Sequence, residues 1–263
     1  MDLGIAGRVA LVTGASAGLG RAAAHALAAE GARVVVSARG EERLRRTADE
    51  IASATGAEVV ALPADMSRPA DVEALVAATV ERFGTVEIAL ANAGGPPGTR
   101  FDNTSAAQVE EAVGLNLMST VRLAQLVVPH MRARRWGRFI ALTSVSVKQP
   151  LPGLILSNTA RAAVVGFVKT MATELAADGI CCNVVAPGYM RTGRVEDLAR
   201  ERAANEGRAQ DEVMAEIAGR IPARRMGTPE ELASVIAFLA SERASYVTGT
   251  TIQVDGGYVQ SLL

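Results

Sequence analysis

The sequence predicts one α/β domain over residues 1–263, in which helices cover both faces of a doubly wound parallel sheet of about seven strands. Three observations predict this fold. Apolar segments of strand length alternate with helical patterns along the chain, and these segments are apolar almost throughout, as strands buried on both faces are. A glycine-rich turn joins the first strand to the first helix. Parallel strands joined by right-handed crossovers account for the alternation.

The expected elements follow one another without a break. Strands are expected at residues 9–13, 33–38, 58–62, 86–91, 138–143, 180–185 and 251–254. Helices are expected at residues 17–30, 41–54, 69–83, 104–134, 154–177 and 229–241. A chain of 263 residues is long enough for one large core, and no linker, repeat or low-complexity segment divides it.

Composition narrows the class of protein. A net charge of -1 argues against a nucleic acid or an anionic membrane as partner. No apolar stretch approaches the roughly 18 residues of a membrane span, and the first residues lack the features of a secretory signal. We therefore expect a soluble, cytoplasmic protein.

Cysteine, histidine and lysine are scarce. Cys181 and Cys182 are adjacent in an apolar run, which predicts burial in a strand and not a redox or metal role. The two histidines stand alone in helical stretches, so no metal site is expected. Lys148 and Lys169 are the only lysines, and arginine supplies the remaining positive charge.

The glycine-rich turn reads Thr-Gly-Ala-Ser-Ala-Gly-Leu-Gly over residues 13–20. Its first glycine can adopt backbone angles that other residues avoid, and the later glycines carry no Cβ to hold a ligand away. The helix that follows directs its first amides and its dipole at the turn, where the pyrophosphate of a dinucleotide fits. The second strand completes a βαβ unit, which favours this interpretation over a plain tight turn. The residues expected at the pyrophosphate are Gly14, Ser16, Gly18, Leu19 and Gly20.

The ends of the next strands carry further cofactor residues. An acid after the second strand would bind the ribose 2′-OH of NAD, whereas Arg39 can pair with a 2′-phosphate and favours NADP(H) over NAD(H). Arg39 facing solvent or stacking on adenine is the alternative. Asp65 and Met66 follow the third strand, where an acid could bond the adenine amine. The small residues after the fourth strand let the backbone approach the ribose, and they are Asn92, Ala93 and Gly94.

The Gly-x-x-x-Gly-x-Gly spacing after Thr13, the Asn-Ala-Gly after the fourth strand and the closing Val-Asp-Gly-Gly resemble the short-chain dehydrogenase/reductase family. The resemblance covers essentially the whole chain and is greatest to the 3-oxoacyl-carrier-protein reductase branch. It implies a Rossmann-type fold, an NAD(P)(H)-dependent oxidoreductase, and a homotetramer built through helices 104–134 and 154–177.

The resemblance also assigns roles near the nicotinamide. It implies that Pro187, Gly188 and Thr192 bind the carboxamide, and that residues 194–223 form a substrate lid. It further implies that Asn116 holds a water near the catalytic lysine position. The lid has an apolar face, which suggests a hydrophobic substrate, although packing of the lid on the protein is the commoner explanation. This face consists of Val195, Leu198, Val213, Met214 and Ile217.

The pattern departs from the family at its catalytic residues. The family has a serine that binds the substrate carbonyl, a tyrosine thirteen positions later, and a lysine four positions after that. Here Ser144 matches the serine, but Ser157 occupies the tyrosine position and Arg161 the lysine position. Arg161 retains a positive charge and could still bind the nicotinamide ribose, but its pKa above about 12 makes that charge permanent.

The substitution has a chemical consequence. The tyrosine of the family protonates the carbonyl oxygen, and its pKa of about 10 can be lowered by the neighbouring lysine. An aliphatic hydroxyl is a far poorer acid, and loss of a positioned general acid costs roughly 10²–10⁴ in rate. Ser144 and Ser157 could polarise the carbonyl while water delivers the proton. Alternatively Tyr189 or Lys148 could be recruited, or the site could bind nucleotide without turnover.

The leading hypothesis is an NADP(H)-dependent oxidoreductase that reduces a carbonyl, or oxidises an alcohol, of a small hydrophobic or activated substrate. Ser144, Ser157, Arg161 and Asn116 are its expected catalytic residues. The alternative is a catalytically silent nucleotide-binding protein with a regulatory role.

Overall fold

A seven-stranded sheet forms the centre of the molecule, with every neighbouring pair of strands parallel. The structure, a computed structural model, describes residues 2–262. The strands are β1 (Val9–Thr13), β2 (Arg33–Ser37), β3 (Val59–Ala61), β4 (Ile88–Ala91), β5 (Gly137–Leu142), β6 (Ile180–Pro187) and β7 (Thr251–Val254). Their spatial order is β3-β2-β1-β4-β5-β6-β7. Strands β2 and β3 are therefore added on one side of β1, and β4 to β7 are added on its other side. The predicted fold class is confirmed.

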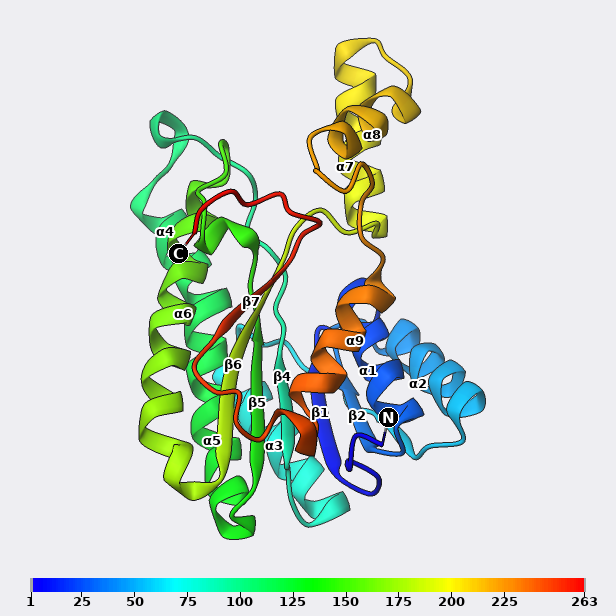
Figure 1. Cartoon of the computed structure of the whole chain (residues 1–263), viewed down its shortest axis with the longest axis vertical. Coiled ribbons are helices and arrows are strands. Elements are labelled where there is room, and N and C mark those ends of the chain that lie inside the picture. The colour runs from blue at the N-terminus through cyan, green and yellow to red at the C-terminus, as the bar shows by residue number, and fades with distance from the viewer. Residues whose placement is uncertain (1, 263) are drawn as a thin grey trace.

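Helices cover both faces of this sheet, as Figure 1 shows. The helices are α1 (Gly18–Ala29), α2 (Glu41–Thr55), α3 (Pro69–Phe83), α4 (Ala106–Val113), α5 (Ser119–Arg134), α6 (Ile155–Leu175), α7 (Gly193–Glu206), α8 (Gln210–Gly219) and α9 (Pro229–Leu239). Helices α3, α5 and α6 pack on one face, and α1, α2 and α9 pack on the other.

The strands explain why both faces bury apolar side chains. In β1, Val9 and Leu11 belong to the core under α3, α5 and α6, whereas Ala10 and Val12 belong to the opposite core. Successive strand residues point to opposite faces. A strand covered on both sides therefore needs apolar residues at every position, which is why the sequence lacks strand alternation.

The helix expected over residues 104–134 consists of three segments. Helices α4 and α5 are joined by one π-helical turn at Gly114–Met118, which places Asn116 inside the protein. By length and composition alone, the continuous helix Ala106–Arg134 could cross a membrane, which the sequence had not led us to expect. In this fold, α5 buries Leu123, Val127 and Met131 in the core instead.

The segment expected to form a lid, called the lid segment or lid below, contains α7 and α8, which project beyond the sheet at the top of Figure 1. Val213 and two alanines of α7 form a small apolar core of their own, against which Met214 and Ile217 pack. Most of the apolar lid face is therefore used to hold α7 and α8 together. Val195 and Leu198 lie outside this small core, and Leu198 is 53% exposed.

Candidate functional site

The glycine-rich turn lies against the end of β4. Gly14 has a φ of +61°, and a Cβ there would come within 2.7 Å of the Asn92 carbonyl oxygen. A Cβ on Gly20 would collide with the Gly14 carbonyl oxygen. Thr13 fixes the two segments, since its Oγ1 accepts from the Asn92 N–H and donates to the Asn92 carbonyl, each at 2.9 Å. Glycine is therefore required by close backbone approach as well as by conformation.

The helix after this turn begins with free donors. Ala17 is the N-cap of α1 and provides no side-chain hydrogen bond. The first backbone amides of a helix have no partner within the helix, so these remain available to an anion. No acidic side chain occupies the first turn of α1. The observed geometry therefore suits a pyrophosphate.

Two clefts of about 970 Å³ and 1030 Å³ open beside the turn and share Ser16, Arg43 and the loop of residues 92–95. The first extends to the ends of β2 and β3, and the second to the end of β5 and to α7. All predicted cofactor-binding residues line one or both clefts, except Pro187 and Gly188. Both clefts lie at the carboxyl ends of the strands, at the point where the strand order reverses, which is where open α/β sheets bind ligands.

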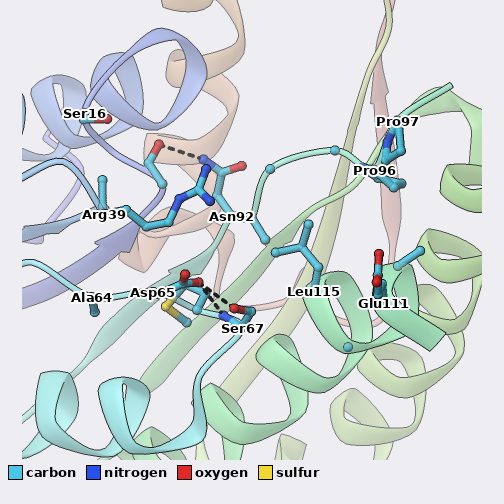
Figure 2. A pocket seen from close by; sticks show the side chains of 18 of the residues that line it. Ser16, Arg39, Ala64, Asp65, Ser67, Asn92, Pro96, Pro97, Glu111 and Leu115 are labelled. Atoms are coloured by element: carbon cyan, nitrogen blue, oxygen red, sulfur yellow. Dashed lines mark hydrogen bonds between the residues drawn. The ribbon is translucent and has the colours of Figure 1, made fainter. Parts of the chain in front are cut away.

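Arg39 and Asp65 lie on one wall of the first cleft, seen on the left of Figure 2. The Asp65 carboxylate accepts hydrogen bonds from the Ser67 N–H at 2.9 Å and the Ser67 hydroxyl at 2.8 Å. These bonds, with a smaller contribution from the charge of Arg39, hold the pKa of Asp65 below its ordinary value. Asp65 is therefore ionised at neutral pH and remains an acceptor beside the cleft.

Pro187 and Gly188 lie at the end of β6. The Gly188 N–H donates to the Val254 carbonyl at 2.9 Å, and a Cβ on Gly188 would collide with Asp255. These two residues are therefore used to join β6 to the end of β7. Thr192 is the N-cap of α7 and lines the second cleft.

The four predicted catalytic residues come from three neighbouring segments. Ser157 and Arg161 lie one turn apart on α6 and are both buried. Ser144 begins the one-turn 3-10 helix Val145–Val147, and its Oγ accepts the Ser146 N–H at 3.1 Å. Helix α6 packs against this turn and against the π-helical turn that carries Asn116.

Arg161 is fixed at the end of β5. Its Nη1 donates to the backbone carbonyls of Leu142 and Thr143, at 3.1 Å each. Leu142, Thr143 and Arg161 all line the second cleft. The guanidinium is therefore anchored to the strand end that immediately precedes Ser144.

Asn116 supports the loop of residues 92–95. Its amide nitrogen donates to the Gly94 carbonyl at 3.0 Å, while its Oδ1 is buried and has no hydrogen-bond partner among residues 2–262. Its backbone carbonyl accepts from the Thr120 hydroxyl at 2.7 Å and the Ser119 hydroxyl at 3.3 Å. The oxygen with capacity to spare for a water is thus the side-chain Oδ1.

Of the predicted catalytic residues, Arg161 lines a cleft, whereas Ser144, Ser157 and Asn116 line neither. Tyr189 and Lys148, the two alternatives to the family's tyrosine, line neither cleft as well. Tyr189 packs edge-on against Tyr258, with ring centroids 5.2 Å apart, and burial raises the pKa of Tyr189 above its ordinary value. A phenol with a raised pKa is a poorer proton donor at neutral pH. Lys148 lines a separate cavity beside α6.

Arg43 and Glu111 are among the wall residues that sequence reasoning missed. Arg43, in the first turn of α2, lines both clefts, and its guanidinium has no ion pair within the described part of the chain. Its position four residues after Arg39 at a helix start was the available signal. Glu111 of α4 lines the far end of the first cleft beside Pro96 and Pro97, as the right side of Figure 2 shows. No motif surrounds Glu111, so the sequence held no signal for it.

The strand order and these clefts define a Rossmann-type dinucleotide-binding protein. A family model described as enoyl-(acyl carrier protein) reductase matches residues 14–259. The chain is 36% identical to the 3-oxoacyl-[acyl-carrier-protein] reductase FabG of Escherichia coli (strain K12), over 95% of this chain and 97% of the relative. It is 38% identical to the short-chain reductase protein NovJ of Streptomyces niveus, over 95% and 93%.

Solved structures agree with these relatives. The L-sorbose reductase of Gluconobacter frateurii, in complex with NADPH and L-sorbose, superposes with a TM-score of 0.97 at 36% identity, and each chain is covered completely. The chain belongs to the short-chain dehydrogenase/reductase family and is an oxidoreductase of that family.

Proposed function

We propose that this protein is an NADP(H)-dependent reductase of a small carbonyl compound that works without a catalytic tyrosine. One observation carries the proposal most directly. The glycine-rich turn, Arg39, the loop of residues 92–95 and Arg161 line two clefts with a common wall. The cofactor and Arg161 can therefore lie side by side along one continuous surface.

The residues present fit NADP(H). The uncapped start of α1 suits a pyrophosphate, and Arg39 with Arg43 supplies two cations for a 2′-phosphate. NADPH is also the cofactor named for the structural relatives, including the sorbose reductase and an NADPH-dependent reductase of bacilysin biosynthesis. When bound, the nicotinamide supplies the hydride.

We assign the polarisation of the carbonyl to Ser144, which directly follows Thr143 of the second cleft wall but does not itself line a cleft. Its Oγ already accepts a hydrogen bond from the Ser146 N–H, so its own proton is left to donate to a substrate oxygen. A hydroxyl aimed at an oxygen that gains negative charge stabilises the transition state more than the ground state. Ser157 is the second proposed donor, and water brings the proton that a phenol supplies elsewhere in the family.

Arg161 contributes a fixed charge. Because it is anchored to the Leu142 and Thr143 carbonyls, it holds the strand end beneath Ser144 and faces the second cleft. A guanidinium does not titrate near neutral pH, so Arg161 serves as an electrostatic anchor for the ribose and does not donate a proton.

The substrate is proposed to be an activated carbonyl. Without a phenolic acid, the reaction depends on an oxygen that already accepts charge easily. An apolar substrate finds less support, because the apolar residues of the lid pack on one another and Glu111 lies at the end of the first cleft.

Replacing Ser144 by alanine tests the proposal. NADPH oxidation is measured spectrophotometrically over a panel of activated carbonyls. We expect Ser144→Ala to lower kcat roughly 10²–10³-fold, the cost of removing one donor to a developing oxyanion, with the dissociation constant of NADPH unchanged.

The matched control is Thr85→Val, which removes a buried hydroxyl that has no hydrogen-bond partner among residues 2–262. Thr85 precedes β4, at the end of that strand opposite to the clefts. This variant should keep full activity. Tight NADPH binding without oxidation by any carbonyl in wild-type protein would instead favour the catalytically silent nucleotide-binding protein.

We also propose a homotetramer, built through the α4–α5 helix and α6. Family resemblance supports this arrangement. The two helices lie together on one side of the sheet, where they can form a four-helix contact with a second copy (Figure 1).

A further inference from the structure

A third cavity, of about 380 Å³, lies between α6, the middle of β6 and the start of β7. None of its lining residues lines either cofactor cleft. Lys148 and Lys169, the only two lysines of the chain, both line it, although 21 residues of sequence separate them. The fold thus brings every lysine of an arginine-rich protein to one cavity.

The two ammonium groups have donors to spare. Lys169 Nζ donates to the Gly249 carbonyl at 2.8 Å, and an ammonium has three donors, so two remain. The Lys148 ammonium makes no hydrogen bond or ion pair within residues 2–262. Thr250 and Thr251 line the same cavity.

The rest of the cavity is neutral. Its remaining wall consists of Val165, Val168, Val184 and Gly249, so no carboxylate lines it among the described residues. Two cations that share a small space without an acid attract an anion from solution. A general need for positive charge on the surface does not explain why both lysines lie at one cavity, because lysines far apart would supply the same charge.

The wall opposite α6 is held firmly. The Gly249 N–H donates to the Cys182 carbonyl at 2.8 Å, and the Thr250 N–H donates to Asn183 Oδ1 at 3.2 Å. Asn183 is buried in β6 and also bonds the Val247 carbonyl. The threonines and the carbonyl that positions Lys169 are therefore set before any ligand arrives, which lowers the entropy cost of binding.

We propose that Lys148 and Lys169 form a binding site for a small oxyanion, either a phosphate or a short-chain carboxylate. The ammonium groups bind the anionic oxygens, Thr250 and Thr251 donate further hydrogen bonds, and the valines accommodate a short apolar substituent. Lys148 also ends the one-turn helix that Ser144 begins, so the bound anion lies at the far end of the turn that carries the proposed carbonyl donor.

Amine acylation followed by mass spectrometry tests the site. Only the two lysines and the N-terminal amine react, which gives two probes and one internal reference. Wild-type protein saturated with NADPH is labelled while phosphate or butyrate is titrated against chloride at constant ionic strength. We expect one of these anions to slow labelling of both lysines several-fold with a single midpoint, and to leave the N-terminal amine unchanged.

Three results would overturn the proposal. The first is no protection of the lysines by either anion, and the second is equal slowing of all three amines. The third is protection in the absence of NADPH that disappears when NADPH is added, which would place the anion in a cofactor cleft. Calorimetry gives an independent readout. Lys148→Gln with Lys169→Gln should lose anion binding, whereas Arg134→Gln, which removes an exposed charge from α5, should retain it. These readouts do not depend on carbonyl reduction, so the two proposals can fail separately.

Discussion

Cofactor choice depends on single charges at the adenosine end of the first cleft. Arg39 and Arg43 line this end, and neither makes an ion pair within the described residues. Asp65, the nearest acid on this wall, is held by Ser67 instead. The two guanidinium groups are therefore available to a 2′-phosphate, which NADP carries and NAD lacks.

We expect Arg39→Ala to weaken NADPH binding roughly 10–100-fold, the equivalent of losing one or two charge-assisted hydrogen bonds. Binding of NADH should change little, because it has no 2′-phosphate. Fluorescence titration of both nucleotides measures the effect. Arg68→Ala is the control, because Arg68 lies near Asp65 but does not line the cleft. Equal weakening of both nucleotides would contradict the assignment.

Site residues could be predicted where they follow a strand directly. The end of a parallel strand has a fixed place at one edge of the sheet, so position alone was enough to predict that Arg39, Asp65 and Asn92 lie at one cleft. Arg43 and Glu111 were not found, because they reach the cleft from helices whose rotation the sequence does not set. Pro187 and Gly188 are used to join β6 to β7.

Among the elements, the lid is held together by charge as well as by its small apolar core. Glu216 of α8 accepts hydrogen bonds from Arg202 at 3.0 Å, Arg208 at 2.9 Å and Arg220 at 2.5 Å. Arg202 lies on α7, so one carboxylate joins the two helices. The hydrogen bond from Arg208, followed by that from Arg202, lowers the pKa of Glu216 to about 2.

The pKa of Glu216 predicts how the lid responds to acid. A carboxylate whose pKa is 4.5 when unfolded and about 2 when folded stabilises the folded lid fully above pH 4.5. This contribution decreases as the pH falls from about 4.5 to about 2, because protonation then favours the unfolded lid. Hydrogen exchange of α7 and α8, corrected for intrinsic rates, should show protection that is constant from pH 7 to 5 and decreases below.

Glu216→Gln should show weaker lid protection at pH 7 and a smaller decrease in acid. Glu212→Gln is the matched control, since Glu212 makes one ion pair, with Arg208 at 3.6 Å. It should behave like wild-type protein. If Glu216→Gln is protected as well as wild type at pH 7, the carboxylate does not hold the helices together.

The bounds of some helices and strands could be predicted from the sequence, and those of others could not. Strand β1 and helix α3 have the expected bounds, because β-branched runs and a proline at the helix start mark them. Thr228 caps α9, and Glu231 completes a capping box. The π-helical turn of Gly114–Met118 was not predicted, because such turns are rare and occur as single turns inside α-helices.

For the whole molecule, the alternation of strands and helices was sufficient to predict the sheet and its two helical layers. It was insufficient to place the lid. Apolar residues of α7 and α8 pack against each other, and the two helices project away from the sheet (Figure 1). Assembly is a property of several chains and has to be measured.

The proposed homotetramer predicts a mass near four times the 27.3 kDa of one chain. Multi-angle light scattering at micromolar concentration measures it. A charge placed at the centre of the proposed contact should dissociate the tetramer without unfolding the sheet, because exposed helix positions tolerate substitution. A particle of 27.3 kDa at all concentrations would contradict the proposed assembly.

The most direct test of the central claim follows deuterium from NADPH, labelled at the transferred position of the nicotinamide, into the carbonyl carbon of an activated substrate. Mass spectrometry of the alcohol product measures the transfer. The proposed function predicts transfer by wild-type protein and roughly 10²–10³-fold slower transfer by Ser144→Ala, at equal occupancy by NADPH. Saturation with NADPH and no deuterium in any product would show a nucleotide-binding protein that does not catalyse reduction. Equal transfer by both proteins would show that another group binds the carbonyl.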